Sequence, residues 1–210
     1  MKTKPYLLLL LIFHVLRSSA QNNELAMDST LFAYYQKCEK KARFPVILSM
    51  GDTLFRMAER LGDKRTQAAA LCHKANYFYF TDKQDSLFKY MQLIQKFALT
   101  TNQPKYYYFI WERYIKSHIK MRKFNLALME LDNMRKKAVE DNYVPGEITC
   151  HNLMTQIYDI KANTRLAIEH LKKAIDLSEQ YIPEDFNLCI LYSNCLLYTS
   201  PSPRDVEESR

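Results

Sequence analysis

Glycine is scarce in this sequence, which has three glycines among 210 residues. Neither a GxGxxG pattern nor a Walker-type loop occurs, which argues against a glycine-rich cradle for phosphates. CxxC, HxxxH and HExxH patterns are also missing, and four histidines stand apart from one another: His73, His118, His151 and His170. We interpret these isolated histidines as packed side chains, and we expect no metal, no cofactor and no catalytic residue in this chain.

Cysteine occurs at wide spacing. Outside the last residues of the chain it stands at Cys38, Cys72, Cys150 and Cys189. Each of these falls within a predicted helix, so we interpret them as small, buried apolar side chains. A disulfide between Cys38 and Cys72 is an open alternative, because disulfides form in exported proteins and sequence alone does not determine their connectivity.

Apolar runs long enough to cross a membrane are lacking. The run Tyr6–Leu16 has eleven residues and follows a basic start, whereas a membrane-spanning helix needs about 20. Ser18 and Ala20 supply the small-x-small pattern of a signal-peptidase site, which predicts a secretory signal peptide over residues 1–20. We expect cleavage after Ala20 and a protein secreted across the cytoplasmic membrane into the periplasm; an uncleaved anchor helix is the alternative.

Acidic side chains are interspersed among the basic ones along the chain, although the formal net charge is +7. No basic stripe with interleaved aromatic residues is evident, and export also argues against a nucleic-acid partner. Hydrophobic residues make up 48% of the sequence. This composition is typical of a folded, largely helical protein and argues against disorder.

The stretch Trp111–Ala138 has the pattern of two amphipathic helices joined by a short polar segment. In its second half, apolar residues that include Ala127 and Leu131 recur at three- and four-residue spacings, which places them on one helix face. The same layout returns about 40 residues later, where Ala167 matches Ala127 and Leu171 matches Leu131. A weaker copy lies the same distance upstream. Two helices in a period of this length predict stacked helical repeats.

This pattern resembles the tetratricopeptide repeat family, in which bulky, small and aromatic residues alternate at fixed positions of two helices. The best match lies in residues 151–174 and consists of Thr155, Tyr158, Ala167, Leu171 and Ala174. The period exceeds the roughly 34 residues of the family, so we expect longer helices or longer connections. The resemblance implies an all-α fold, namely a right-handed α-solenoid of stacked antiparallel helix pairs.

The sequence predicts one domain after the leader, since no Gly- or Ser-rich linker divides it. Asp28, Asp63 and Asp82 are expected to open helices, Pro104 to lie in the first turn of another, and Gly62 to end one. The expected parts are a divergent first helix pair or cap over 21–62, repeats over 63–101, 102–142 and 143–182, and a truncated fourth repeat over 183–194.

Residues 195–210 differ in character from the rest of the chain. The prolines Pro201 and Pro203 would end the helix that the repeat requires there. The segment Cys195–Asp205 resembles the one-frame translation of a transposase-type sequencing-library adaptor. We therefore expect this tail to be non-native and the natural protein to continue beyond Asn194; a native Ser/Pro-rich loop is the alternative.

In the resembled family, the first helices of the pairs line a groove that holds a peptide or partner segment. Carried onto this sequence, the candidate groove residues are Asn76, Tyr79, Glu112, Lys116, Asn152 and Gln156. The resemblance implies a non-enzymatic scaffold that binds a protein or peptide, as the extracytoplasmic sensory region of a larger signal-transduction protein. A free periplasmic adaptor in envelope assembly, or the N-terminal part of an enzyme, are the alternatives. A membrane segment beyond Asn194 is compatible with the first.

Overall fold

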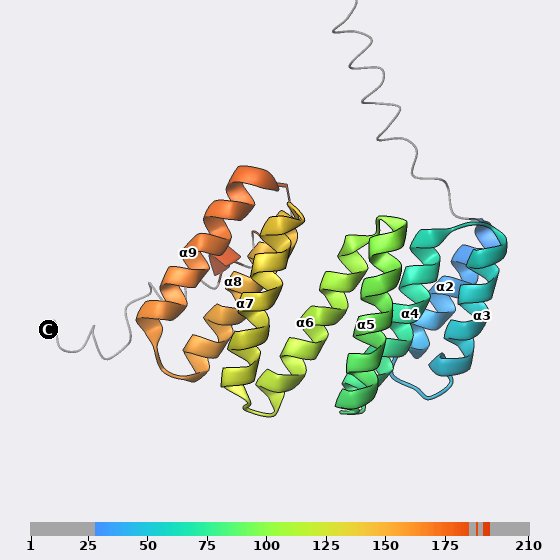
Figure 1. Cartoon of the computed structure of the whole chain (residues 1–210), viewed down its shortest axis with the longest axis horizontal. Helices are drawn as coiled ribbons and strands as arrows, with labels where there is room; N and C mark the ends of the chain where they lie inside the picture. The colour runs from blue at the N-terminus through green and yellow to red at the C-terminus, as the bar shows by residue number, and fades with distance from the viewer. Residues whose placement is uncertain (1–27, 185–187, 189–190, 194–210) are drawn as a thin grey trace, which may run out of the picture.

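The computed structural model describes residues 28–184, 188 and 191–193. Within this part the chain forms only helices and their connections, which confirms the all-α prediction (Figure 1). The helices are α2 (Ser29–Lys41), α3 (Ile47–Arg60), α4 (Lys64–Phe80), α5 (Gln84–Thr101), α6 (Pro104–Lys120), α7 (Phe124–Glu140), α8 (Val144–Ile160) and α9 (Thr164–Tyr181). The predicted signal peptide, Cys189 and the predicted non-native tail lie outside the described residues.

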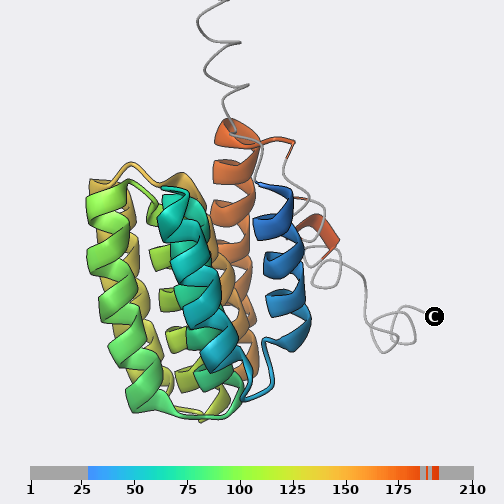
Figure 2. The ribbon, with the colours of Figure 1, turned by 90° about the vertical axis from the view of Figure 1, so that its right-hand side faces the viewer.

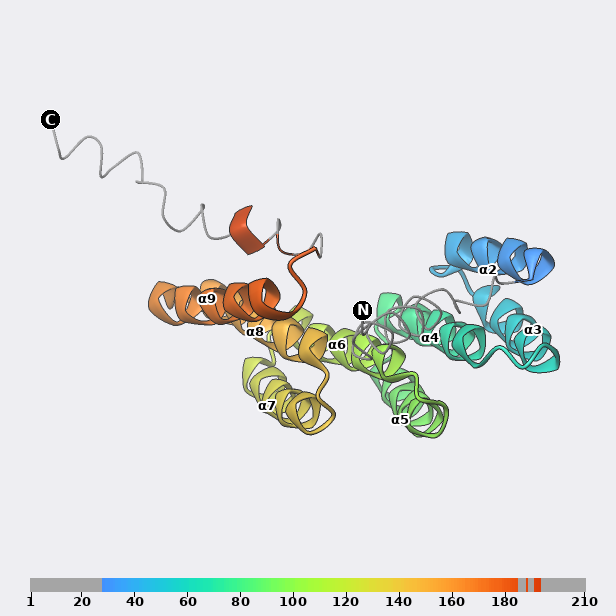
Figure 3. The same cartoon turned by 90° about the horizontal axis from the view of Figure 1, so that it is seen from above.

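Consecutive helices pack against each other along the whole array, running up and down in turn (Figures 1 and 2). The first helix of each pair also contacts the first helix of the next pair, since α2 contacts α4, α4 contacts α6, and α6 contacts α8. Seen from above, α4, α6 and α8 form one row, and α5 and α7 lie on the same side of that row (Figure 3). The first helices of the pairs therefore form a layer of their own.

The helices from α4 to α9 start at a constant interval. Helices α4, α6 and α8 begin at Lys64, Pro104 and Val144, so successive pairs are separated by the same length of chain, as the sequence predicts. We call this length the pair period. Helices α5, α7 and α9 begin midway between these starts, so each helix follows the one before it by half a pair period. The turns between these helices are short, so the length of the helices determines the period.

Six left-handed residues explain the constant interval. They have φ between +52° and +69° and recur every half pair period, at Gly62, Asp82, Asn102, Arg122, Asn142 and Ala162. In each case the next residue donates its N–H to the carbonyl five residues earlier, at 2.8–3.0 Å. This is the Schellman bond that ends a helix on a left-handed residue. Only Gly62 is a glycine, so the positions of glycine in the sequence do not indicate the other five turns.

Polar caps set several helix starts where they were predicted. The Asp28 carboxylate accepts the N–H groups of Thr30 and Leu31 at 3.0 Å, and Asp63 accepts the N–H of Thr66 at 3.0 Å. Pro104 occupies the first turn of α6, where a missing N–H costs nothing. The prediction that Asp82 opens a helix is wrong. Its φ of 56° places it in the left-handed turn, and α5 begins at Gln84.

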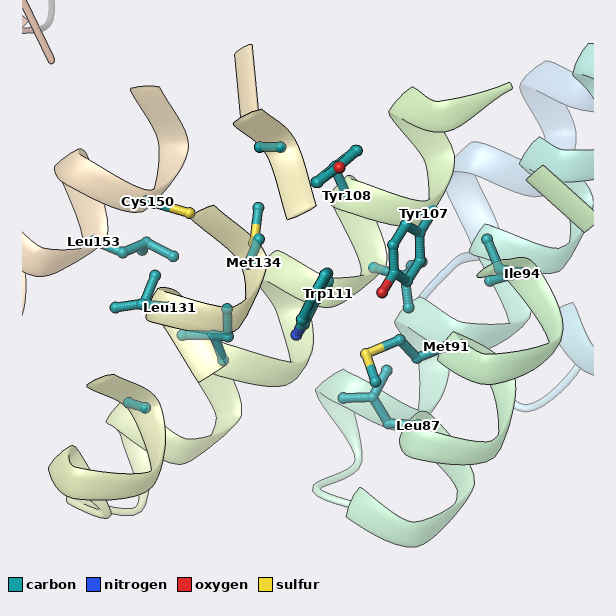
Figure 4. Close-up of a cluster of buried hydrophobic side chains, with 14 of the residues drawn as sticks. Leu87, Met91, Ile94, Tyr107, Tyr108, Trp111, Leu131, Met134, Cys150 and Leu153 are labelled. Atoms are coloured by element: carbon teal, nitrogen blue, oxygen red, sulfur yellow. The ribbon is translucent and has the colours of Figure 1, made fainter. Parts of the chain in front are cut away.

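The core runs through the middle of the array, where Figure 4 shows Trp111, and it also contains Ala127. Trp111 is 7% exposed and Ala127 fully buried. The Trp111 ring packs beside Tyr107, with ring centroids 5.0 Å apart, and its Nε1 donates to Oε2 of Glu130 at 2.8 Å. A buried indole is stable here because its N–H has a partner.

Small side chains recur at the end of the second helix of each pair. They are almost completely buried and stand one pair period apart, at Ala58, Ala98, Ala138 and Ser178. Their size lets the next helix approach closely. A Cβ added to Gly146, in the first turn of α8, would lie 3.0 Å from the Ala138 Cβ. Cys38, Cys72 and Cys150 are buried free thiols, so the interpretation as apolar side chains is confirmed and the Cys38–Cys72 disulfide is absent.

Candidate binding groove

The layer of first helices encloses a hollow of about 450 Å³. Its wall comes from α2, α4, α6 and the start of α8, which all belong to this layer. The lining side chains that carry polar or aromatic groups are Tyr35, Glu39, His73, Asn76, Lys105, Tyr106, Tyr108, Phe109, Glu112, Tyr143 and Thr149. An adjoining hollow of about 340 Å³ shares Glu39, His73 and Asn76 and extends toward Arg43 and Phe80. We call the two together the groove.

Two of the six predicted groove residues, Asn76 and Glu112, line this groove. Lys116 lies one turn further along α6 and forms an ion pair with Glu112. Tyr79 is half-buried, and its ring faces the Arg113 guanidinium, 5.4 Å from the ring centroid.

The remaining two candidates lie on α8, away from the groove. Asn152 is half-buried and Gln156 is exposed. Residues that stand one pair period apart along the sequence therefore differ in their surroundings from pair to pair.

Several polar atoms on the first-helix layer are buried without a hydrogen-bond partner in the protein. They are Nε2 of Gln67, Nε2 of His73, Oδ1 of Asn76, Nε of Arg113 and Oδ1 of Asn152. Leaving such a group unpaired costs about 1–3 kcal/mol, so a ligand that pairs with it gains that free energy on binding. Two of these five residues, His73 and Asn76, line the groove.

His73 is a buried polar side chain of the groove, at 8% exposed. The ring of Tyr35 on α2 packs against it, with centroids 5.2 Å apart. Burial lowers the pKa of His73 below its usual range, and the nearby carboxylate of Glu39 opposes this shift only in part. His73 is therefore neutral near pH 7, with one nitrogen that donates and one that accepts.

Tyrosines make up much of the wall and are held rigidly. Tyr108 donates its hydroxyl to Oδ2 of Asp141 at 2.7 Å, and its ring stacks on Tyr143 at 4.6 Å. Asp141 also pairs with Lys137. Tyr35 donates to Glu39, and burial, reinforced by this bond, raises the pKa of its hydroxyl above the usual range. These phenols stay protonated at physiological pH and act as hydrogen-bond donors and apolar surface.

Sequence reasoning missed the residues that close the groove. His73 lies one turn before the predicted groove residue Asn76 on α4, and this spacing was the available signal. Tyr35 comes from the first helix pair, which was interpreted as a divergent pair or a cap, and Tyr143 comes from a connection between helices. Their approach depends on how the pairs stack, which a spacing rule along one helix does not contain.

A second polar contact lies between α8 and α9. Nδ1 of His151 and Nδ1 of His170 are 3.0 Å apart, and the Tyr158 ring stacks on His170 with centroids 5.4 Å apart. The interpretation of these histidines as isolated is therefore wrong. They occupy the positions that Trp111 and Glu130 hold one repeat earlier, so the pair period contained the signal. Burial lowers the pKa of His151 to about 4, with a contribution from His170.

Two further properties concern the described residues alone. They contain no cluster of three or more histidine, cysteine or carboxylate side chains arranged to hold a metal ion. None of their helices combines the length and the apolar character that crossing a membrane requires. Comparison of the chain with protein-family models, curated proteins and solved structures gave no match.

Proposed function

We propose that this chain is a tetratricopeptide-like, right-handed α-solenoid that binds an extended protein or peptide segment, without catalysing a reaction. The constant recurrence of helix pairs supports the fold assignment, together with the column of small side chains at their ends. Each pair buries its apolar face against the next, as repeat proteins do.

The observation that carries the binding proposal is the set of unpaired polar atoms on the first-helix layer. Asn76 lies in the groove on α4, and Asn152 lies on α8, on the other side of α6. Each offers a buried amide oxygen without a partner. A backbone N–H of an extended segment is a suitable donor for such oxygens. A segment that crosses α4, α6 and α8 can meet both residues.

We further propose that the chain is the extracytoplasmic sensory region of a longer signal-transduction protein. The predicted leader over residues 1–20 supports export, and the expected continuation beyond Asn194 supports a longer natural protein. A free periplasmic adaptor and the N-terminal part of an enzyme are the competing assignments. The native coding sequence past Asn194 separates them, because it would encode a membrane span with a signalling domain, a stop codon after a further repeat, or a catalytic motif.

The binding proposal is tested with a peptide library displayed on phage and panned against the purified protein. Selected peptides are then titrated by fluorescence polarisation against the parent protein, Asn76→Ala and Asn133→Ala. We expect Asn76→Ala to weaken binding about fivefold to tenfold, the effect of losing one hydrogen bond. Asn133 is exposed on α7, away from the groove, so Asn133→Ala should bind normally. Selected peptides that bind both variants equally well would contradict the proposal.

A further inference from the structure

The charged side chains that line the larger hollow are unusual for this protein. The chain carries a formal net charge of +7, yet two carboxylates, Glu39 and Glu112, and one ammonium, Lys105, line this hollow. Lys105 and Glu39 are both exposed. Glu112 is compensated by Lys116, whereas Glu39 lies beside the neutral hydroxyl of Tyr35. The carboxylates that line this hollow therefore outnumber its ammonium groups by one.

The hollow also contains hydrogen-bond acceptors without a partner. The Oδ1 atom of Asn76 is an unpaired acceptor, and Glu39 contributes further lone pairs. His73 is more than nine-tenths buried, neutral, and unpaired at Nε2, which accepts when the proton is on Nδ1. Ammonium and guanidinium groups have donors and no acceptors. They match this set of acceptors, whereas a carboxylate does not.

The aromatic rings add a second attraction for cations. The rings of Tyr35, Tyr106 and Phe109 line the hollow. Two cations of the protein already use such rings, because Nζ of Lys105 lies 5.1 Å from the Tyr106 centroid and the Arg113 guanidinium 4.9 Å from that of Phe109. A cation over an aromatic face is favoured, and the attraction grows when the cation is desolvated.

We propose that the partner segment inserts one lysine or arginine side chain into this hollow, between the Glu39 carboxylate and the tyrosine rings. This inference rests on the proposed peptide-binding function and specifies which side chain anchors the peptide. The occupant is a peptide rather than a free amine, because the unpaired Asn152 oxygen lies outside the hollow on α8. A single small cation cannot reach both places.

The test uses short acetylated peptides with the sequence of a peptide selected by phage display. They differ only at one central position, which is arginine, lysine, leucine or glutamate. Fluorescence polarisation measures their affinity for the purified protein, and free L-arginine is titrated as a competitor. We expect the arginine and lysine peptides to bind about tenfold tighter than the leucine peptide. Glu39→Gln, which keeps the acceptor for Tyr35, should remove that preference, and the exposed Glu59→Gln should not.

Each outcome separates this inference from the proposal on which it rests. Tightest binding of the glutamate peptide, or equal binding of all four, would overturn the cationic anchor and leave a peptide groove in place. Competition by free L-arginine as effective as that of the peptide would show a small-molecule site and overturn the inference. Peptides that bind with unchanged affinity when Asn76 is replaced would contradict the groove itself.

Discussion

The turns between helices allow a sharp test, because one of them carries an alanine in the left-handed region. Ala162 has φ 55° and is exposed, so its backbone conformation can be changed without disturbing side-chain packing. A left-handed conformation costs an L-residue about 1–2 kcal/mol. Glycine avoids this cost, but it loses about 0.5–1 kcal/mol through its greater freedom in the unfolded chain. The difference predicts that Ala162→Gly stabilises the protein by about 0.5–1 kcal/mol.

Thermal unfolding followed by circular dichroism measures this effect. For a chain of this size, about 1 kcal/mol corresponds to about 2–4 °C in Tm, so we expect Ala162→Gly to raise the Tm by about 1–4 °C. Two matched variants should have the opposite sign. Ala33→Gly, in the exposed middle of α2, should cost about 1 kcal/mol. Gly62→Ala should cost about as much, since its new Cβ meets no atom within 4 Å and only the backbone is strained.

The sign of the Ala162→Gly effect on the Tm tests whether residue 162 is left-handed in solution. A Tm lowered by the same amount as in Ala33→Gly would mean that residue 162 is helical in solution. The constant interval between helix starts would then need another explanation. Urea unfolding at a fixed temperature gives an independent value for the same free energy.

Two further outcomes follow from packing and from charge. Ala127→Trp should destabilise the protein by about 3 kcal/mol through overpacking, whereas Leu126→Trp, at a position 44% exposed, should have little effect; equal urea midpoints for the two variants would contradict the placement of the repeat. The folded protein keeps His151 neutral down to about pH 4, while the unfolded chain takes up a proton near 6.5. The contribution of His151 to the free energy of unfolding is complete above about pH 6.5 and is lost as the pH falls toward 4. Allowing for partial solvent exposure, this loss of stability is about 1–2 kcal/mol. His151→Gln should make the decrease of stability with falling pH shallower. Titration of the His151 ring by NMR above about pH 6.5 would refute this pH dependence.

Much of the fold could be predicted because its signals are local. The spacing of Ala127 and Leu131 defines a helix face, and its recurrence at Ala167 and Leu171 defines the repeat. Caps such as Asp28 and Asp63 act within one turn of their own helix. The placement of Asp82 failed because a carboxylate fits both a helix start and a left-handed turn, and the Schellman bond of the preceding helix decides between them.

The candidate site was predicted only in part, for a physical reason. Asn76 and Glu112 were found because α4 and α6 are both first helices of their pairs, as the repeat predicts. His73, Tyr35 and Tyr143 were missed because they meet through the stacking of three different pairs.

The amino-acid pattern by itself determined that this chain is helical, that its helices recur in pairs at a constant period, and that Trp111 and Ala127 face a common core. These properties depend on periodicity along one helix. The tertiary structure alone decided which polar atoms remain unpaired, that His151 meets His170, and where the pairs enclose a hollow. These properties depend on distances between helices, which are set by the size of the side chains at each contact.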